Sequence, residues 1–252
     1  MFRYFHILLL VTLFSSYSFG YWVYELRSPL LGRLGKVTIL PNTKKGNKYR
    51  VEIKLESTGI AAFMAHNRRE KYISEGKIHK GSYQTKRMKV RHKSGKLNQV
   101  DEYKFDYRRN RIKRHKIRWK RGKVDKDLTD YLKYFTTMDA IALYKNIIIP
   151  LSKQNNSWRR SYLVAGMEKS GGRVIVTVPD KKRKEYELKK LGIKNAQIVI
   201  LSSPGTILKK KNREMILAIN QDGVVLKGRI PNMPIVGNVY IILTQHKSIT
   251  KK

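Results

Sequence analysis

The segment YRVEIKLE at residues 49–56 decides the fold, because every second residue in it is apolar and the residues between are charged. Successive side chains of a β-strand point to opposite faces, so this alternation predicts a strand with one buried and one solvated face. The same period recurs around Met88 and Val90 and in the aromatic and charged residues 103–108. We therefore expect a mainly β protein with minor α structure, built as a curved, largely antiparallel sheet or open half-barrel.

Residues typical of tight turns separate the predicted strands. Such residues occur at 42–46, 80–82, 93–95, 109–110 and 171–172. Towards the C-terminus, strands are expected at 197–201, 214–219, 224–230 and 239–243, with a hairpin turn at 220–223. The result is a meander of hairpins.

Three segments break the alternation. Residues 139–148 have apolar side chains at helical spacing, with Thr136 or Thr137 as N-cap and Pro150 as a stop, which predicts a helix packed on the sheet. Residues 58–65 could form one apolar turn between two strands. Residues 181–190 are rich in Lys and Glu and precede Gly192, which predicts a short exposed helix.

The first twenty residues have the pattern of a secretory signal peptide: a short polar start with Arg3, an apolar run, and small residues near Gly20. That run is shorter than the roughly 20 helical residues that a bilayer requires, and no later segment is long and apolar enough to span one. We expect a periplasmic protein with a signal peptide at 1–20, one β-rich domain at 21–245 and a disordered basic tail at 246–252.

The chain of 252 residues carries 55 Lys and Arg against 18 Asp and Glu, a net charge of +37. Such an excess indicates an anionic partner or surface. Residues 68–126 alone hold 23 Lys and Arg and 6 Asp and Glu. The alternative is a solvated sheet face with no ligand. If the block binds an anion, the candidate residues are Arg68, Arg69, Lys104, Arg108, Lys116 and Arg118.

Aromatic residues interleaved with this basic block resemble a nucleic-acid platform, but period two places aromatics and cations on opposite faces. Together with the predicted secretion, this argues against nucleic acid. Anionic phospholipid, lipopolysaccharide or an acidic glycan fits the compartment better. An envelope protein is a further candidate partner.

The concave side of a half-barrel could hold acyl chains. The residues expected to line such an apolar pocket are Ile60, Phe63 and Met64 with Ile141 from the predicted helix. The alternative is an ordinary filled core, which apolar residues at strand or helix spacing usually build.

No pattern for catalysis emerges. Glu52 and Glu56 share a predicted strand face among cations, so charge compensation explains them. His66, His79 and His92 are spaced thirteen apart without a second local ligand, and the chain has no cysteine. We expect neither catalytic residues nor a metal, and no cofactor.

Several segments in order resemble the family catalogued as domain of unknown function 3108, found in envelope proteins of Gram-negative bacteria. They are YEL at 24–26, LGKVTI at 34–39, YRVEI at 49–53, STGIA at 57–61, YISEG at 72–76, MDAIALY at 138–144, MILAI at 215–219, LKGRI at 226–230 and GNV at 237–239. The resemblance covers most of the mature chain. It implies a curved antiparallel sheet similar to that of periplasmic lipoprotein carriers, and it implies no catalytic residues.

Together these observations predict a non-enzymatic envelope protein that binds an anionic envelope component on its basic face by electrostatic attraction, or lipid on its concave side. The alternative from another functional class is a structural or partner-docking module with no small ligand.

Overall fold

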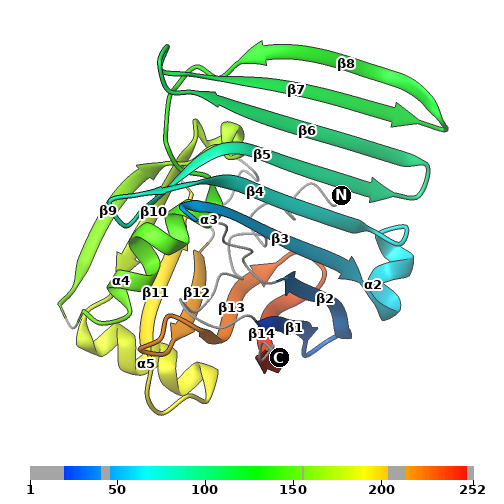
Figure 1. Cartoon of the computed structure of the whole chain (residues 1–252). Coiled ribbons are helices and arrows are strands. Elements are labelled where there is room, and N and C mark those ends of the chain that lie inside the picture. The colour runs from blue at the N-terminus through cyan, green and yellow to red at the C-terminus, as the bar shows by residue number, and fades with distance from the viewer. Residues whose placement is uncertain (1–19, 41–45, 155, 204–213, 249–252) are drawn as a thin grey trace.

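The computed structural model describes residues 20–40, 46–154, 156–203 and 214–248, which form one curved antiparallel sheet that does not close (Figure 1). The first eight strands are β1 Gly20–Ser28, β2 Gly32–Leu40, β3 Lys48–Ser57, β4 Arg69–His79, β5 Ser82–Ser94, β6 Leu97–Asp106, β7 Arg111–Lys120 and β8 Lys123–Tyr131. The other six are β9 Trp158–Leu163, β10 Arg173–Val178, β11 Gln197–Ser202, β12 Glu214–Ile219, β13 Val225–Met233 and β14 Gly237–Ser248. The predicted fold class is confirmed.

The order of the strands brings the two ends of the described chain together. Strands β8 to β1 follow one another, β1 pairs with β14, and β14 to β9 complete the sheet, so β8 and β9 are its edges. Gly20 of β1 lies opposite Ser248 of β14. Residues 246–248, which we expected in a disordered tail, therefore belong to the last strand. Residues 1–19 of the predicted signal peptide and residues 249–252 of the predicted tail lie outside the described part.

The inner face of the sheet carries the core, as the alternation predicts. In β3, Tyr49, Val51, Ile53 and Leu55 are buried, whereas the residues between them are partly or fully exposed. The right-handed twist that strands adopt curves the sheet around this apolar face. The core extends over both arms, from Tyr72 and Tyr103 on one to Val176 and Leu217 on the other.

A second, smaller core covers the outer face of β11 and β12. The helix α5, Lys181–Leu191, packs there with Leu191 against Ile198, Ile200 and Ile216. These two strands are therefore buried on both faces, which explains their almost continuous apolar sequence. The bounds of α5 and its Gly192 cap agree with the prediction, but the helix is exposed on one side only, with Glu187 and Leu191 buried.

The predicted helix at 139–148 lies on the inner face and has three parts: α3 Ala140–Leu143, a π-helical segment Tyr144–Ile148 and α4 Ile149–Leu151. Its N-cap is Asp139, whose side chain accepts a hydrogen bond from the Ala142 amide, and neither predicted threonine has this role. The predicted stop at Pro150 comes slightly early, because α4 includes Pro150 and ends one residue later, at Leu151.

Candidate functional site

The outer face of β3 to β7 carries rows of charged side chains, because the antiparallel register aligns every second residue of neighbouring strands. One row is Arg50, Glu75, Arg87, Lys104 and Lys113, and the next is Glu52, Ile73, Lys89, Glu102 and His115. In the first row three cations are direct neighbours. Like charges directly opposite each other destabilise a sheet, and a bound anion would relieve that repulsion.

A pocket of about 170 Å³ opens on this face over β3, β4 and β5. Its lining residues are Arg50, Ile73, Glu75, Arg87, Lys89 and Arg91. Four of the six are cations and one is a carboxylate, so the lining is strongly positive. Ligand pockets for drug-sized molecules measure about 300–1,000 Å³. The volume therefore suits a small group rather than an acyl chain.

The cations of the pocket are only partly neutralised. Arg50 forms an ion pair with Glu75. Arg87 Nε lies 3.1 Å from Glu102 Oε1, and Lys89 Nζ lies 3.6 Å from Glu102 Oε2. Within the described part of the chain, Arg91 forms no ion pair. Four cations thus share two carboxylates.

The shift in the pKa of Glu102 reflects this positive environment. Burial raises the pKa of its carboxyl group, but the guanidinium of Arg87 and the ammonium groups of Lys89 and Lys104 outweigh that effect. The net result is a pKa below the ordinary value of 4.5. Glu102 is therefore ionised at neutral pH, and the positive charge of the neighbouring pocket exceeds what it can balance.

The structure does not bring the six predicted anion-binding residues into one site. Lys104 lies on the outer face, in the register position opposite Lys113. Lys116 and Arg118 lie on the inner face, where their partners are Asp101 at 3.7 Å and Asp125. The expectation that these cations form one basic face is wrong, because the register of β6 and β7 places Lys104 on the opposite face from Lys116 and Arg118.

The other three predicted residues are also separated. Arg108 lies in the exposed connection between β6 and β7. Arg69 is exposed on the outer face of β4. Arg68 is buried, and its Nε lies 2.8 Å from Glu70, whose carboxylate is also 3.1 Å from His92 Nδ1. Arg68 thus belongs to a buried ion-pair cluster and is not available to an external anion.

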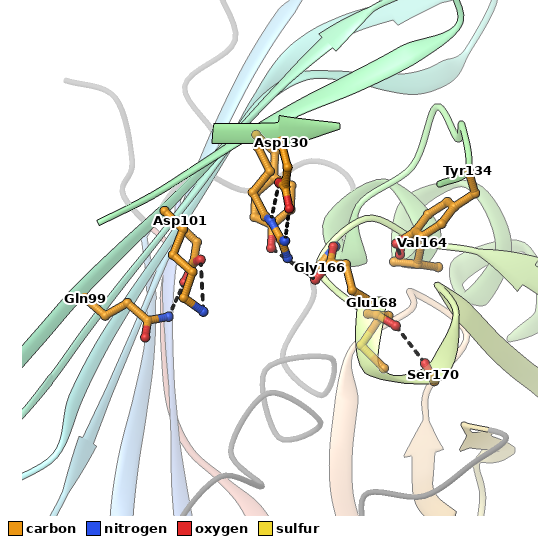
Figure 2. A network of polar contacts seen from close by, with 12 residues as sticks. Gln99, Asp101, Asp130, Tyr134, Val164, Gly166, Glu168 and Ser170 are labelled. Carbon is orange, nitrogen blue, oxygen red and sulfur yellow. Dashed lines mark hydrogen bonds and ion pairs between the residues drawn. The ribbon is translucent and has the colours of Figure 1, made fainter. Parts of the chain in front are cut away.

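The inner face of β6 to β8 carries charged side chains beside the buried core residues Tyr103, Phe105 and Ile112, and most of these charges are paired. Gln99 donates to Asp101 (Figure 2). Arg114 forms a bidentate pair with Asp130. Glu168, from the turn between β9 and β10, lies opposite them and accepts a 3.0 Å hydrogen bond from the Gly166 amide (Figure 2). These contacts use cations and carboxylates in similar numbers, so this face has no charge excess like that of the outer pocket.

The four residues of the predicted apolar pocket are separated as well. The short helix α2, Gly59–Met64, contacts β2 and β3 and has no buried residue. Ile60 and Phe63 point to solvent, and Met64 is half-buried. Ile141 belongs to α3 and is fully buried in the core. An apolar pocket lined by this set is therefore wrong, because one helical turn at the sheet end cannot cover the inner face.

Sequence reasoning missed the pocket residues Arg50, Glu75, Arg87, Lys89 and Arg91. A signal was present, since Arg87, Lys89 and Arg91 occupy every second position of one predicted strand. What was missing is the lateral order of β3, β4 and β5, which places Arg50 and Glu75 beside them.

Among the described residues, no three His, Cys, Asp or Glu side chains are grouped so that they could hold a metal ion. No helix in the same residues is long and apolar enough to span a membrane.

Comparison with solved structures gives a likeness in fold, whereas comparison by sequence gives none. No protein-family model matches the sequence, and no curated protein matches it. The fold is similar to the crystal structure of a beta-barrel-like protein of the domain of unknown function DUF1849 from Brucella abortus. The TM-score is 0.53 at 10% identity, over 92% of this chain and 98% of that chain. At this identity the likeness supports the fold alone.

Proposed function

We propose that this protein is a periplasmic, non-catalytic binder of a phosphate-bearing anionic component of the cell envelope, and that the pocket on the outer face of β3 to β5 holds the phosphate group. The observation that carries the proposal is the pocket lining of four cations and one carboxylate. A phosphate group suits it, because Arg and Lys donors form charge-assisted hydrogen bonds to phosphate oxygens that are about twice as strong as neutral ones.

The compartment in this proposal rests on the signal-peptide pattern of residues 1–20 and on the resemblance to the domain of unknown function 3108. In the periplasm of a Gram-negative cell, phosphate groups are presented by phospholipid headgroups and by lipopolysaccharide. The pocket volume of about 170 Å³ fits a headgroup and leaves the acyl chains outside.

The proposal is tested with two soluble probes, inorganic phosphate and monomeric short-chain phosphatidylglycerol, titrated by calorimetry into the mature protein. We expect the variant Arg87→Gln/Lys89→Gln/Arg91→Gln to bind about tenfold more weakly than the wild type, since it removes most of the pocket charge. Binding of the short-chain lipid alone would identify a headgroup as the ligand. Equal binding of inorganic phosphate would identify the free anion.

The matched control changes the net charge equally and leaves the pocket intact. Lys181, Lys182 and Lys189 are exposed on α5, on the other arm of the sheet, so Lys181→Gln/Lys182→Gln/Lys189→Gln should bind as the wild type does. The single variant Arg91→Gln disturbs no ion pair between described residues. It tests the pocket in case the triple variant does not fold. If the pocket and α5 variants lose affinity equally, the pocket is not the site, and a partner-docking role becomes the better hypothesis.

A further inference from the structure

One end of the sheet collects five connections that are distant in the sequence. We call this end the α2 rim and define it as residues 29–31, 58–68, 95–96, 121–122 and 234–236. Figure 1 shows α2 and the turns from β5 to β6 and from β7 to β8 at this same end.

A series of hydrogen bonds links these connections around the rim. Ser28 Oγ donates to the carbonyl of Val236 at 2.6 Å, which joins the β1–β2 turn to the β13–β14 turn. The Thr58 amide donates to the carbonyl of Leu34 at 3.0 Å, which places α2 beside the start of β2. These bonds fix the order of the connections from the β13–β14 turn through the β1–β2 turn to α2.

The order continues from α2 towards the edge strand β8. The Gly95 amide donates to the carbonyl of His66 at 2.8 Å, and the Arg121 amide donates to the carbonyl of Lys96 at 2.9 Å. These bonds tie the segment after α2 to the β5–β6 turn and that turn to the β7–β8 turn. The five connections thus form one continuous surface.

Large apolar side chains point to solvent from this surface. Of the seven large hydrophobic residues exposed among the described residues, four lie in the rim and a fifth begins β8 beside it. They are Leu30 at 72%, Ile60 at 58%, Phe63 at 85%, Ile235 at 55% and Val124 at 60% exposed. Apolar side chains gathered in this way on one end mark an interaction surface.

The same end is rich in unpaired cations. The rim residues include no Asp or Glu. Six exposed cations in or beside the rim form no ion pair with any described residue: Arg69, Lys93, Lys96, Lys120, Arg121 and Lys123. The adjoining strand ends carry four carboxylates. Glu25 pairs with Arg27 and Arg33, and Asp125 pairs with Arg118. Glu70 is buried and pairs with Arg68, and Glu56 is exposed. The rim is therefore strongly cationic as well as apolar.

From this combination we propose that the α2 rim docks on the surface of an anionic lipid bilayer, with Ile60 and Phe63 inserted among the headgroups. Apolar side chains on a cationic surface are what peripheral membrane binding requires, because the apolar groups leave water and the cations face anionic headgroups. The apolar residues stand on separate loop tips with cations between them. That spacing suits a fluid lipid surface better than one contiguous protein interface.

This inference goes beyond the proposed function and does not depend on the phosphate pocket. On β5, Arg91 lies two residues from Lys93, which is beside the rim. Lys89 and Arg87 lie further along the same strand, away from the rim. The pocket faces outward across the strands, whereas the rim is at their end. A protein docked by the rim would therefore present the pocket beside the bilayer.

The first test measures, by co-sedimentation, how the wild type and its variants bind vesicles that contain mostly phosphatidylethanolamine and a minority of phosphatidylglycerol. We expect Ile60→Ser/Phe63→Ser to bind about tenfold more weakly, because two inserted apolar side chains are lost. The matched control is Tyr131→Ser/Tyr186→Ser, which removes the two exposed large hydrophobic residues away from the rim. Circular dichroism and thermal unfolding check that both variants fold. Wild-type binding by the rim variant, or an equal loss in the control, overturns the proposal.

A second measurement keeps Ile60 and Phe63 unchanged and detects insertion by fluorescence. Since the chain has no cysteine, a single Leu30→Cys or Lys80→Cys can carry an environment-sensitive fluorophore. Lys80 lies in the β4–β5 turn at the opposite end of the sheet. We expect a blue shift with the anionic vesicles at position 30 and none at position 80, and no shift with phosphatidylcholine vesicles. A shift at position 80 alone, or at neither position, contradicts rim docking.

The two proposals fail separately. If the pocket is wrong, the triple pocket variant binds the soluble probes as the α5 control does, and the fluorophore at position 30 still shifts. If the rim is wrong, that shift is absent while the pocket variant still loses affinity for the soluble probes.

Discussion

The hydroxyl of Tyr103 on β6 donates a 3.2 Å hydrogen bond to the carboxylate of Glu168, in the turn between β9 and β10. Arg114 Nη1 lies 3.9 Å from the same carboxylate. In strand order β6 and β10 belong to opposite arms of the sheet. Because edge strands β8 and β9 do not pair, this contact is one of those that hold the arms together across the inner face.

We predict that Tyr103→Phe lowers the free energy of unfolding by about 1 kcal/mol, the net value of a typical intramolecular hydrogen bond. The loss should be accompanied by faster amide exchange in β9 and β10, since that arm loses a contact to the other. Urea unfolding and hydrogen exchange measure the two effects. Tyr131→Phe, at an exposed ring, is the control and should change neither. Unchanged exchange in β9 and β10 would show that the contact does not restrain the arms.

A buried ion pair fastens α5 to the sheet. Arg229 Nη2 lies 2.5 Å from Glu187 Oε2, both side chains are buried, and Arg183 pairs with the other Glu187 oxygen at 2.8 Å. Breaking a buried pair by removing one partner leaves an uncompensated charge. We predict that Glu187→Leu destabilises the protein by about 3–5 kcal/mol.

The double variant Glu187→Leu/Arg229→Met should recover much of this loss, because no buried charge remains. Denaturant midpoints of the single and double variants measure the coupling. If the double variant loses the sum of the two single losses, the pair does not act as a unit.

The positions of strands and helices in this protein can be predicted from its sequence more closely than the arrangement of its surface side chains. The alternation at 49–56 predicts the buried face of β3, and Gly192 marks the end of α5, because each signal is contained in a few adjacent residues. The burial of β11 and β12 on both faces could not be predicted, because we expected α5 to be an exposed helix and it instead covers their outer face.

The candidate site is harder to predict because it depends on register between strands. Whether Lys104 and Lys116 share a face is set by the β6–β7 turn, which pairs Asp106 with Arg111. A shift of one residue would exchange the faces of all cations on β7. The same reasoning applies to the pocket, which needs β3, β4 and β5 side by side. Composition identified the basic region, and only the register located the cations within it.

Beside a bulge in β5, the pairing of β4 with β5 leaves no room for a side chain at Gly76. The register shifts between Glu75 and Gly76, and a Cβ at residue 76 would lie 2.0 Å from the carbonyl oxygen of Gln84 and 2.7 Å from the Tyr49 ring. We predict that Gly76→Ala destabilises the protein by about 1–3 kcal/mol, because backbone must move to admit the methyl group. Thermal unfolding measures the loss. The neighbouring Lys77→Ala should have little effect, and an equally small effect of Gly76→Ala would show that the strands separate easily here.

Asp139 makes the stability of the fold depend on pH. Burial raises the pKa of its carboxyl group above the ordinary value of 3.8, although hydrogen bonds with Ser74, the Ala142 amide and Thr85 oppose the shift. The folded state therefore holds the proton to higher pH than the unfolded state does. The stabilisation that this proton provides is complete below the unfolded pKa and is lost as pH rises through the folded pKa.

We predict that Asp139→Asn removes this loss while keeping the helix cap, since an Asn oxygen can still accept from the Ala142 amide. Relative to the wild type, the variant should gain free energy of unfolding as the pH rises from acidic to neutral. Urea unfolding of both proteins across this range measures the difference, in which the contributions of other carboxylates cancel. Parallel stability curves would mean that Asp139 does not titrate differently in the folded and unfolded states, and the buried carboxyl would then have no part in the pH dependence.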